Sequence, residues 1–304
     1  MILEKIEGNS IKQTTIKNRI ESVGIGLHKG EPIEIALEPM EANSGIVFYR
    51  SDVGMSVRAT PDSVVNTQMA TVIGDGENYI STIEHLLSAI YSYGIDNIRV
   101  VVNASEVPVM DGSSASFCML LDEAGKRVLS ENKKFLIIKR EVEVVDGKKF
   151  AKVTPSLKPI YDFTIDFDHP IIARQEYRFE FSKKSFIKEI SKARTFGFLK
   201  DVQYLRSRGL ALGGSLENAV VLDDNKILNP EGLRYKDEFV RHKILDAIGD
   251  LSLLGAAIVG DYRSFAGSHN LNHKLTKEIL RDPKNYEIKT FSKESAKELQ
   301  KVFA

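Results

Sequence analysis

A histidine and two aspartates recur at four-residue intervals in segment 238–250 of this sequence. His242, Asp246 and Asp250 would share one face of an α-helix, because residues four apart lie about one turn apart. The remaining positions are largely apolar, so this polar face is expected to press against protein rather than water. Such a histidine and aspartate can bind one divalent cation, and a further aspartate can orient a second histidine. The alternative is a surface helix with charge pairs between turns.

A second candidate pair, Glu84 and His85, stands at the expected start of another helix. If His85, His242 and Asp246 converge, they form a set of three ligands with a fourth position left open, as in catalytic zinc sites. Glu84 would then be placed to accept a proton from water. Two plainer alternatives stay open. Ser81 and Glu84 match a capping box, and His85 could be a hydrogen-bonded core histidine.

Three other positions are weaker candidates. His269 stands in a Gly/Ser segment after an apolar strand, where an exposed loop histidine is the alternative. Thr195 would ordinarily be a helix-end or turn residue. The glycines around His28 could cradle a phosphate, but a hairpin turn explains them better.

The elements that must position these residues follow the same order twice, with strands first and helices after. Strand patterns are expected in residues 11–50, 98–102, 135–138, 161–167 and 177–181, with a hairpin turn at Asp146-Gly147. Helical patterns are expected in residues 81–94, from 113 onward, in 183–192 and in 238–250. This order predicts an α+β fold of two similar sheet-plus-helices layers rather than a parallel doubly wound sheet.

The composition excludes several classes of protein. The 304 residues carry 42 basic and 42 acidic side chains, so the excess of positive charge typical of nucleic-acid binders is missing. A single cysteine, Cys118, excludes an intramolecular disulfide. There is no apolar run of about 18 residues. We therefore expect a cytoplasmic monomer that binds no nucleic acid and does not insert stably into a membrane.

Six blocks of sequence together resemble the LpxC family, the UDP-3-O-acyl-N-acetylglucosamine deacetylases of lipid A synthesis. In chain order they are STIEHL from Ser81, GIDNI from Gly94, PVMDGS from Pro108, ARTFGF from Ala193, RGLALGGS from Arg208 and DEFVRHKILDAIGD from Asp237. The resemblance implies zinc-dependent hydrolysis of the N-acetyl group of UDP-3-O-acyl-N-acetylglucosamine, giving UDP-3-O-acyl-glucosamine and acetate, the committed step of lipid A biosynthesis. A generic zinc peptidase would need an unmatched HExxH motif. A non-catalytic, zinc-containing sugar-nucleotide binding protein stays open.

The resemblance also implies the roles of individual residues. The zinc ligands fall on His85, His242 and Asp246, and the general base falls on Glu84. The threonine that stabilises the oxyanion falls on Thr195, a substrate-contacting phenylalanine on Phe196, an essential lysine on Lys243, the second histidine on His269 and its aspartate partner on Asp250.

The resemblance further implies two α+β domains with the active site between facing helices. The boundary is expected at the polar segment 130–134, because a strand pattern restarts directly after it. Residues 1–130 would carry Glu84 and His85, residues 131–280 would carry Thr195, His242, Asp246 and His269, and residues 281–304, which match no block of the family, would form an extension. An apolar passage for the acyl chain is expected near residues 190–215, lined by Phe196, Phe198, Leu199, Leu205, Leu210 and Leu212.

Overall fold

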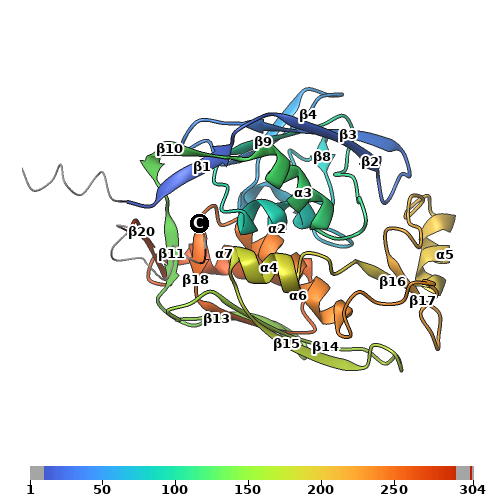
Figure 1. The fold of residues 1–304 in the computed structure, drawn as a ribbon. Coiled ribbons are helices and arrows are strands. Elements are labelled where there is room, and N and C mark those ends of the chain that lie inside the picture. The colour runs from blue at the N-terminus through green and yellow to red at the C-terminus, as the bar shows by residue number, and fades with distance from the viewer. Residues whose placement is uncertain (1–9, 292–301, 303–304) are drawn as a thin grey trace, which may run out of the picture.

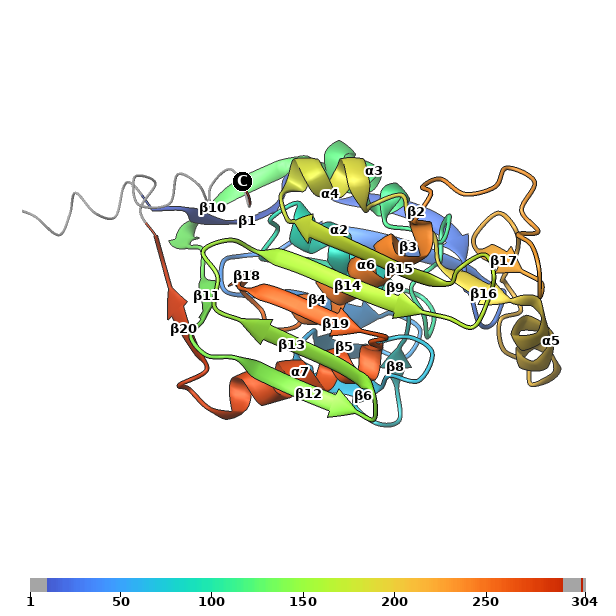
Figure 2. The same ribbon diagram turned by 90° about the horizontal axis from the view of Figure 1, so that it is seen from below.

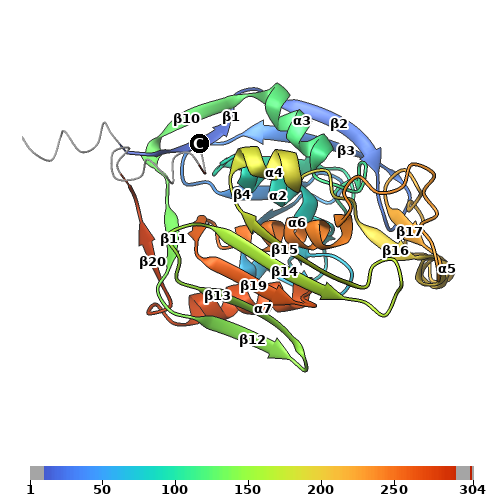
Figure 3. The same cartoon turned by 60° about the horizontal axis from the view of Figure 1, so that its bottom comes forward.

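The computed structural model describes residues 10–291 and residue 302. Two five-stranded sheets form the outer layers of the molecule, and helices lie between them (Figure 1). The view in Figure 3 shows α2 (Glu84–Ser92) and α6 (Glu238–Ser252) in this inner layer. The expected α+β fold, with helices of two similar halves facing each other, is confirmed.

The first sheet has the strand order β2-β3-β9-β4-β5. Its strands are β2 (Ile20–Ile25), β3 (Pro32–Pro39), β4 (Ile46–Arg50), β5 (Met55–Arg58) and β9 (Ile98–Val102). The late strand β9 is antiparallel to β3 and parallel to β4, so it joins two hairpins. The helices of this half are α2 and α3 (Ala115–Ala124).

The second sheet repeats this plan with the order β12-β13-β19-β14-β15 (Figure 2). Its strands are β12 (Val142–Asp146), β13 (Lys149–Thr154), β14 (Ile160–Asp166), β15 (Arg174–Glu180) and β19 (Asp261–Phe265). Here β19 takes the place of β9, because it is antiparallel to β13 and parallel to β14. The two halves therefore share one topology although no repeat is visible in their sequences.

The remaining elements complete the described chain. They are β1 (Lys12–Ile16), η1 (Pro61–Ser63), β6 (Val64–Asn66), β7 (Val72–Gly74), β8 (Tyr79–Ile80), β10 (Lys126–Asn132), β11 (Phe135–Ile138), α4 (Lys183–Glu189), β16 (Phe196–Phe198), α5 (Leu199–Ser207), β17 (Val220–Leu222), β18 (Ala257–Val259), α7 (His269–Arg281) and β20 (Tyr286–Lys289). The unit formed by β16, α5 and β17 projects from one end of the molecule (Figures 1 and 2).

Burial explains why these sequences form these layers. Strand β14 buries every second residue, namely Tyr161, Phe163 and Ile165, which is the pattern of a sheet with one face on a core. Helix α2 is buried at every residue, and α6 at all but two, because both lie in the inner layer. The alternative of a solvated surface helix for residues 238–250 is therefore wrong.

Most element boundaries agree with expectation. The Asp146-Gly147 turn is confirmed between β12 and β13, whereas the helix expected over residues 183–192 ends at Glu189. We propose to keep the domain division near residue 130, although it falls within β10. Strand β20 lies in the expected 281–304 extension, of which residues 292–301 and 303–304 are outside the described part. Among the described residues, none of the helices has the length and apolar content needed to cross a bilayer.

Candidate metal centre and active site

Helices α2 and α6 approach each other closely because α6 carries a glycine at the crossing point. A Cβ atom at Gly249 would lie 2.1 Å from the carbonyl oxygen of Glu84. Gly249 is thus the residue of α6 that lets the first turn of α2 pack against it. This contact brings His85 on α2 towards His242 and Asp246 on α6.

We predict that Gly249→Ala separates the two helices and weakens the metal centre. Alanine has a better helix propensity than glycine by about 1 kcal/mol, but overpacking against a rigid backbone typically costs about 1–3 kcal/mol. A displacement of about 1 Å in a catalytic site can cost about 100-fold in rate. Thermal unfolding, zinc titration and turnover of the variant are the measurements. Wild-type zinc affinity and turnover would contradict this account of the glycine.

The side chains of His85, His242 and Asp246 converge and are all buried. Asp246 Oδ1 lies 3.6 Å from His85 Nε2 and 3.4 Å from His242 Nε2. Ligands about 2.0–2.1 Å from a tetrahedral zinc ion are about 3.3–3.4 Å apart, close to these two separations. The ligand atoms of all three residues lie within 4.8 Å of one another. Asp246 Oδ1 also has no hydrogen-bond partner among the described residues, although it is buried. The three groups therefore form a possible metal-binding triad that fits a zinc ion.

The protonation states of His242 and Asp246 suit metal binding. His242 Nδ1–H donates a hydrogen bond to the carbonyl oxygen of Ala193 at 3.0 Å, which leaves Nε2 as the free lone pair. Burial lowers the pKa of His242 to about 3, so the ring is neutral at pH 7. Burial acts to raise the pKa of Asp246, but His242 and Lys243 outweigh it and hold that pKa well below its usual value.

Glu84, the first residue of α2, is buried beside the triad. Burial raises the pKa of its carboxyl group, as expected for a general base matched to neutral pH. Its Oε2 accepts a hydrogen bond from the backbone N–H of Thr71 at 3.1 Å. The helix N-cap is Ile83, with no side-chain cap bond, so the capping-box alternative for Ser81 and Glu84 is wrong.

His269 lies across the site from the triad and is held by a carboxylate. It is the first residue of α7 rather than a loop residue, and it is largely buried. Its Nδ1 donates to Asp250 Oδ2 at 2.8 Å, while its Nε2 lies 3.9 Å from Glu84 Oε1. Asn272 Nδ2 also donates to Asp250 Oδ2 at 2.8 Å. These contacts point Nε2 of His269 towards Glu84.

Thr71 joins the two sides of the site, and the sequence pattern did not single it out. Its backbone N–H donates to Glu84 Oε2, and its hydroxyl donates to Asp250 Oδ1 at 2.5 Å. Thr71 thereby fixes the carboxylate of Glu84 and the partner of His269 relative to each other. A threonine just before a short strand carries no recognisable signal of such a role.

The remaining expected site residues lie along the wall of the same cavity. Thr195 is partly buried, and its backbone N–H donates to Gly112 O at 2.8 Å. Lys243 Nζ donates to Asp246 Oδ2 at 2.9 Å and lies 5.7 Å from the centre of the Phe196 ring. Burial lowers the pKa of Lys243, but Asp246 and the other nearby carboxylates outweigh this effect and raise it. The ammonium group is therefore charged at neutral pH.

A cavity of about 600 Å³ extends from the triad to the projecting unit of β16, α5 and β17. Glu84, Thr195, Lys243 and His269 line one part of it together with the triad. Apolar residues line most of the remainder, and they include Phe167, Phe196, Phe198, Leu199, Val202, Leu205, Leu216, Val221 and Leu228.

Only some of the residues expected to line an apolar passage lie on the wall of this cavity. Phe196, Phe198, Leu199 and Leu205 line the cavity as expected. Leu210 and Leu212, which follow α5, do not line it and are exposed. Leu27 and Met69 of the first half were not expected, but they contribute to the wall.

Comparison with known proteins supplies a family. The sequence model of the family described as "LpxC: UDP-3-O-acyl N-acetylglycosamine deacetylase" matches residues 13–281. A protein of Campylobacter fetus named UDP-3-O-acyl-N-acetylglucosamine deacetylase is 66% identical over 294 residues, which cover 97% of this chain and 100% of the relative. Proteins of the same name are 66% identical in Campylobacter hominis and 64% identical in Campylobacter jejuni, with the same coverage.

Proposed function

Because the chain belongs to the LpxC family, we propose that it hydrolyses the N-acetyl group of UDP-3-O-acyl-N-acetylglucosamine in lipid A biosynthesis. The products would be UDP-3-O-acyl-glucosamine and acetate, and the cofactor would be Zn²⁺. The observation that carries the proposal is the convergence of His85, His242 and Asp246 beside Glu84 and His269 at one end of a largely apolar cavity.

Zinc held by His85, His242 and Asp246 would supply a Lewis acid for the amide carbonyl and lower the pKa of water beside it. Glu84 then accepts a proton from the water molecule whose oxygen attacks the carbonyl carbon. Its raised pKa makes it a stronger base than an exposed glutamate.

Thr195 and His269 act on the two ends of the amide. The Thr195 hydroxyl donates to the carbonyl oxygen as negative charge develops there, and one such donor is typically worth about 3–4 kcal/mol. His269 protonates the nitrogen as the carbon–nitrogen bond breaks, so the leaving group departs as a neutral amine. Asp250 keeps the Nε2 atom of His269 directed at the site.

Lys243 and the apolar wall account for the rest of the substrate. The ammonium group of Lys243 supplies positive charge for the anionic nucleotide or for the tetrahedral intermediate, and Phe196 contacts the substrate beside it. The apolar part of the cavity would receive the 3-O-acyl chain. A non-catalytic sugar-nucleotide binding protein would have no use for the base Glu84 and the proton donor His269 in one cavity.

We predict that a substrate without the 3-O-acyl group reacts far more slowly than the acylated one. Each methylene buried in the cavity contributes about 0.8 kcal/mol, and part of that binding energy holds the amide in position. The measurement is acetate release from both substrates by the purified protein. Equal kcat/KM values would show that the apolar part of the cavity does not bind the 3-O-acyl chain. No acetate release from either substrate would refute the proposed activity.

We predict that His269 sets the basic limb of the pH profile, since it must be protonated to donate. Burial lowers its pKa, but Asp250 and Glu84 outweigh burial and raise it to about 9. Activity should therefore persist below this pKa and decline as the pH rises through it. Asp250→Asn removes one of the two carboxylates, so the basic limb should move to lower pH.

The pH prediction is tested by kcat/KM against pH for wild type, Asp250→Asn and His269→Ala. The last variant should keep its zinc and lose a factor of about 100 or more in kcat, as expected for a missing general acid. An unmoved basic limb in Asp250→Asn, together with near-normal turnover of His269→Ala, would make this pair merely structural.

A further inference from the structure

Arg194 and Glu238 form a fully buried ion pair that the chemistry above does not use. The side chain of Arg194 is 1% exposed and that of Glu238 is 0% exposed. Neither residue lines the cavity. A buried ion pair is often no more stabilising than apolar residues of similar volume, so stability alone is a weak reason for its presence.

Glu238 binds both the backbone and the side chain of Arg194. Its Oε1 accepts from the Arg194 backbone N–H and from Nε, both at 2.9 Å. Its Oε2 accepts from Arg194 Nη2 at 3.2 Å and from the Arg234 backbone N–H at 2.6 Å. These bonds fasten Arg194 to the first turn of α6.

Two further contacts use the remaining guanidinium donors. Arg194 Nη1 donates to Glu231 Oε1 at 2.6 Å, and Nη2 donates to Gly232 O at 2.7 Å. The planar guanidinium therefore fixes Arg194 to α6 and to the loop that precedes it at once, which a lysine cannot do with one ammonium group.

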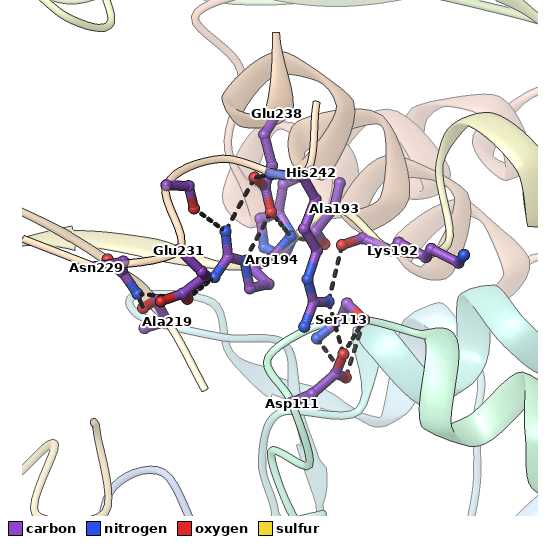
Figure 4. A network of polar contacts seen from close by, with 12 residues as sticks. Asp111, Ser113, Lys192, Ala193, Arg194, Ala219, Asn229, Glu231, Glu238 and His242 are labelled. Atoms are coloured by element: carbon purple, nitrogen blue, oxygen red, sulfur yellow. Dashed lines mark hydrogen bonds and ion pairs between the residues drawn. The ribbon is translucent and has the colours of Figure 1, made fainter. Parts of the chain in front are cut away.

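The two neighbours of Arg194 in the chain both belong to the site. The carbonyl of Ala193 accepts the bond from His242 Nδ1, and His242 stands one turn after Glu238 on α6 (Figure 4). On the other side, the backbone N–H of Thr195 donates to Gly112 O and its carbonyl accepts from Val220 N, both at 2.8 Å. Segment 193–195 thus carries the Ala193 carbonyl, which orients His242, and the Thr195 hydroxyl, to which we assign stabilisation of the oxyanion.

We propose that the Arg194–Glu238 pair is a positioning device that holds segment 193–195 in register with α6. It keeps the Ala193 carbonyl on His242 Nδ1, so that Nε2 stays directed at the metal, and it places Thr195 beside the same site. This inference rests on the proposed function for the role of Thr195. Mutation of a group that hydrogen-bonds a metal ligand typically lowers metal affinity or activity by about 10–100-fold.

A merely structural ion pair predicts a different result. Its loss would lower the unfolding temperature and leave zinc affinity and kcat unchanged in the protein that remains folded. The positioning role predicts weaker zinc binding and a lower kcat in folded protein, with KM nearly constant, because His242 and Thr195 act on the reacting amide.

The test uses full-length protein with Arg194→Lys, and also with the double change Arg194→Met and Glu238→Gln. The double variant removes both charges together. The glutamine at position 238 keeps a side-chain oxygen that can accept the hydrogen bond from the backbone N–H of residue 194. The double variant therefore remains informative if Arg194→Lys does not fold. The matched control is Arg178→Lys, since Arg178 binds Asp162 and Asp261 on the second sheet, half exposed and outside the cavity. Circular dichroism establishes folding, competition with a chelator gives the zinc Kd, and acetate release gives kcat and KM.

We expect zinc Kd to rise and kcat to fall about 10–100-fold in folded Arg194 variants, with the control within about twofold of wild type. Zinc Kd and kcat within about twofold of wild type in either folded variant would overturn the positioning role. The zinc measurement needs no turnover, so it decides on the His242 part of the inference even if the wild type releases no acetate and the proposed function fails.

Discussion

His242→Ala is expected to lose most of its zinc and nearly all of its activity. His242 supplies one of the three convergent groups, and its Nε2 lies 3.4 Å from Asp246 Oδ1. Catalytic zinc is held by three protein ligands, and only His85 and Asp246 would remain in this variant. Lewis-acid stabilisation is worth several kcal/mol and each 1.36 kcal/mol is tenfold, so kcat/KM should fall by about 1,000-fold or more. Zinc per chain is measured by elemental analysis after dialysis, and turnover by acetate release.

His273→Ala is the matched control for this change. His273 is a partly buried histidine on α7, and it belongs neither to the triad nor to the cavity wall. Its removal should leave one zinc ion per chain and near-normal turnover. Full zinc occupancy in His242→Ala would contradict the assignment of the ligands.

Glu84→Gln is expected to keep its zinc and lose turnover. Glutamine preserves the size of the side chain and can still accept the hydrogen bond from Thr71, but it cannot accept a proton from water. Loss of a positioned general base costs about 100- to 10,000-fold. The effect should appear in kcat, since the carboxylate acts on the reacting water rather than on the bound substrate.

Zinc content, kcat and KM of Glu84→Gln are compared with those of Glu77→Gln, a change at an exposed glutamate of the first half. The control should match wild type in all three quantities. If Glu84→Gln turned over within about tenfold of wild type, the general base would have to be another group. Loss of its zinc would instead assign Glu84 to the metal centre.

Sequence periodicity was sufficient for the layers of the fold. The strands around Phe163 and the helix around His242 follow periods of two and 3.6, because each element buries one face on a common core. The pairing of strands was not predictable in this way. Insertion of β9 and β19 between two hairpins is decided by contacts between residues far apart in the chain.

The candidate site was predictable where several signals coincide. The spacing of His242, Asp246 and Asp250 indicated one polar helix face, Glu84 and His85 stood together at the expected start of another helix, and the resemblance to a family then implied a role for each of them. The structure brings the triad together, and the roles of its members remain predictions. By contrast, Thr71 and Arg194 act through bonds to residues remote in sequence, so neither spacing nor composition could identify them.

The lining of the expected apolar passage shows a third limit. Six apolar residues near residues 190–215 were expected to line it, yet two of them, Leu210 and Leu212, are exposed. Apolar residues can be assigned to a buried face only when they recur with the period of a helix or a strand. The irregular segment after α5 has no such periodicity. The wall contributed by Leu27 and Met69 depends on how the two halves pack, which local patterns do not specify.

The most direct test of the whole account is acetate release from UDP-3-O-acyl-N-acetylglucosamine before chelation, after chelation and after zinc is added back. We expect the purified protein to release one acetate per free amine formed. Removing the metal should abolish release, and about one zinc ion per chain should restore it. Release that continues unchanged in fully metal-free protein, or zinc-loaded protein that binds the substrate and releases no acetate, would contradict it.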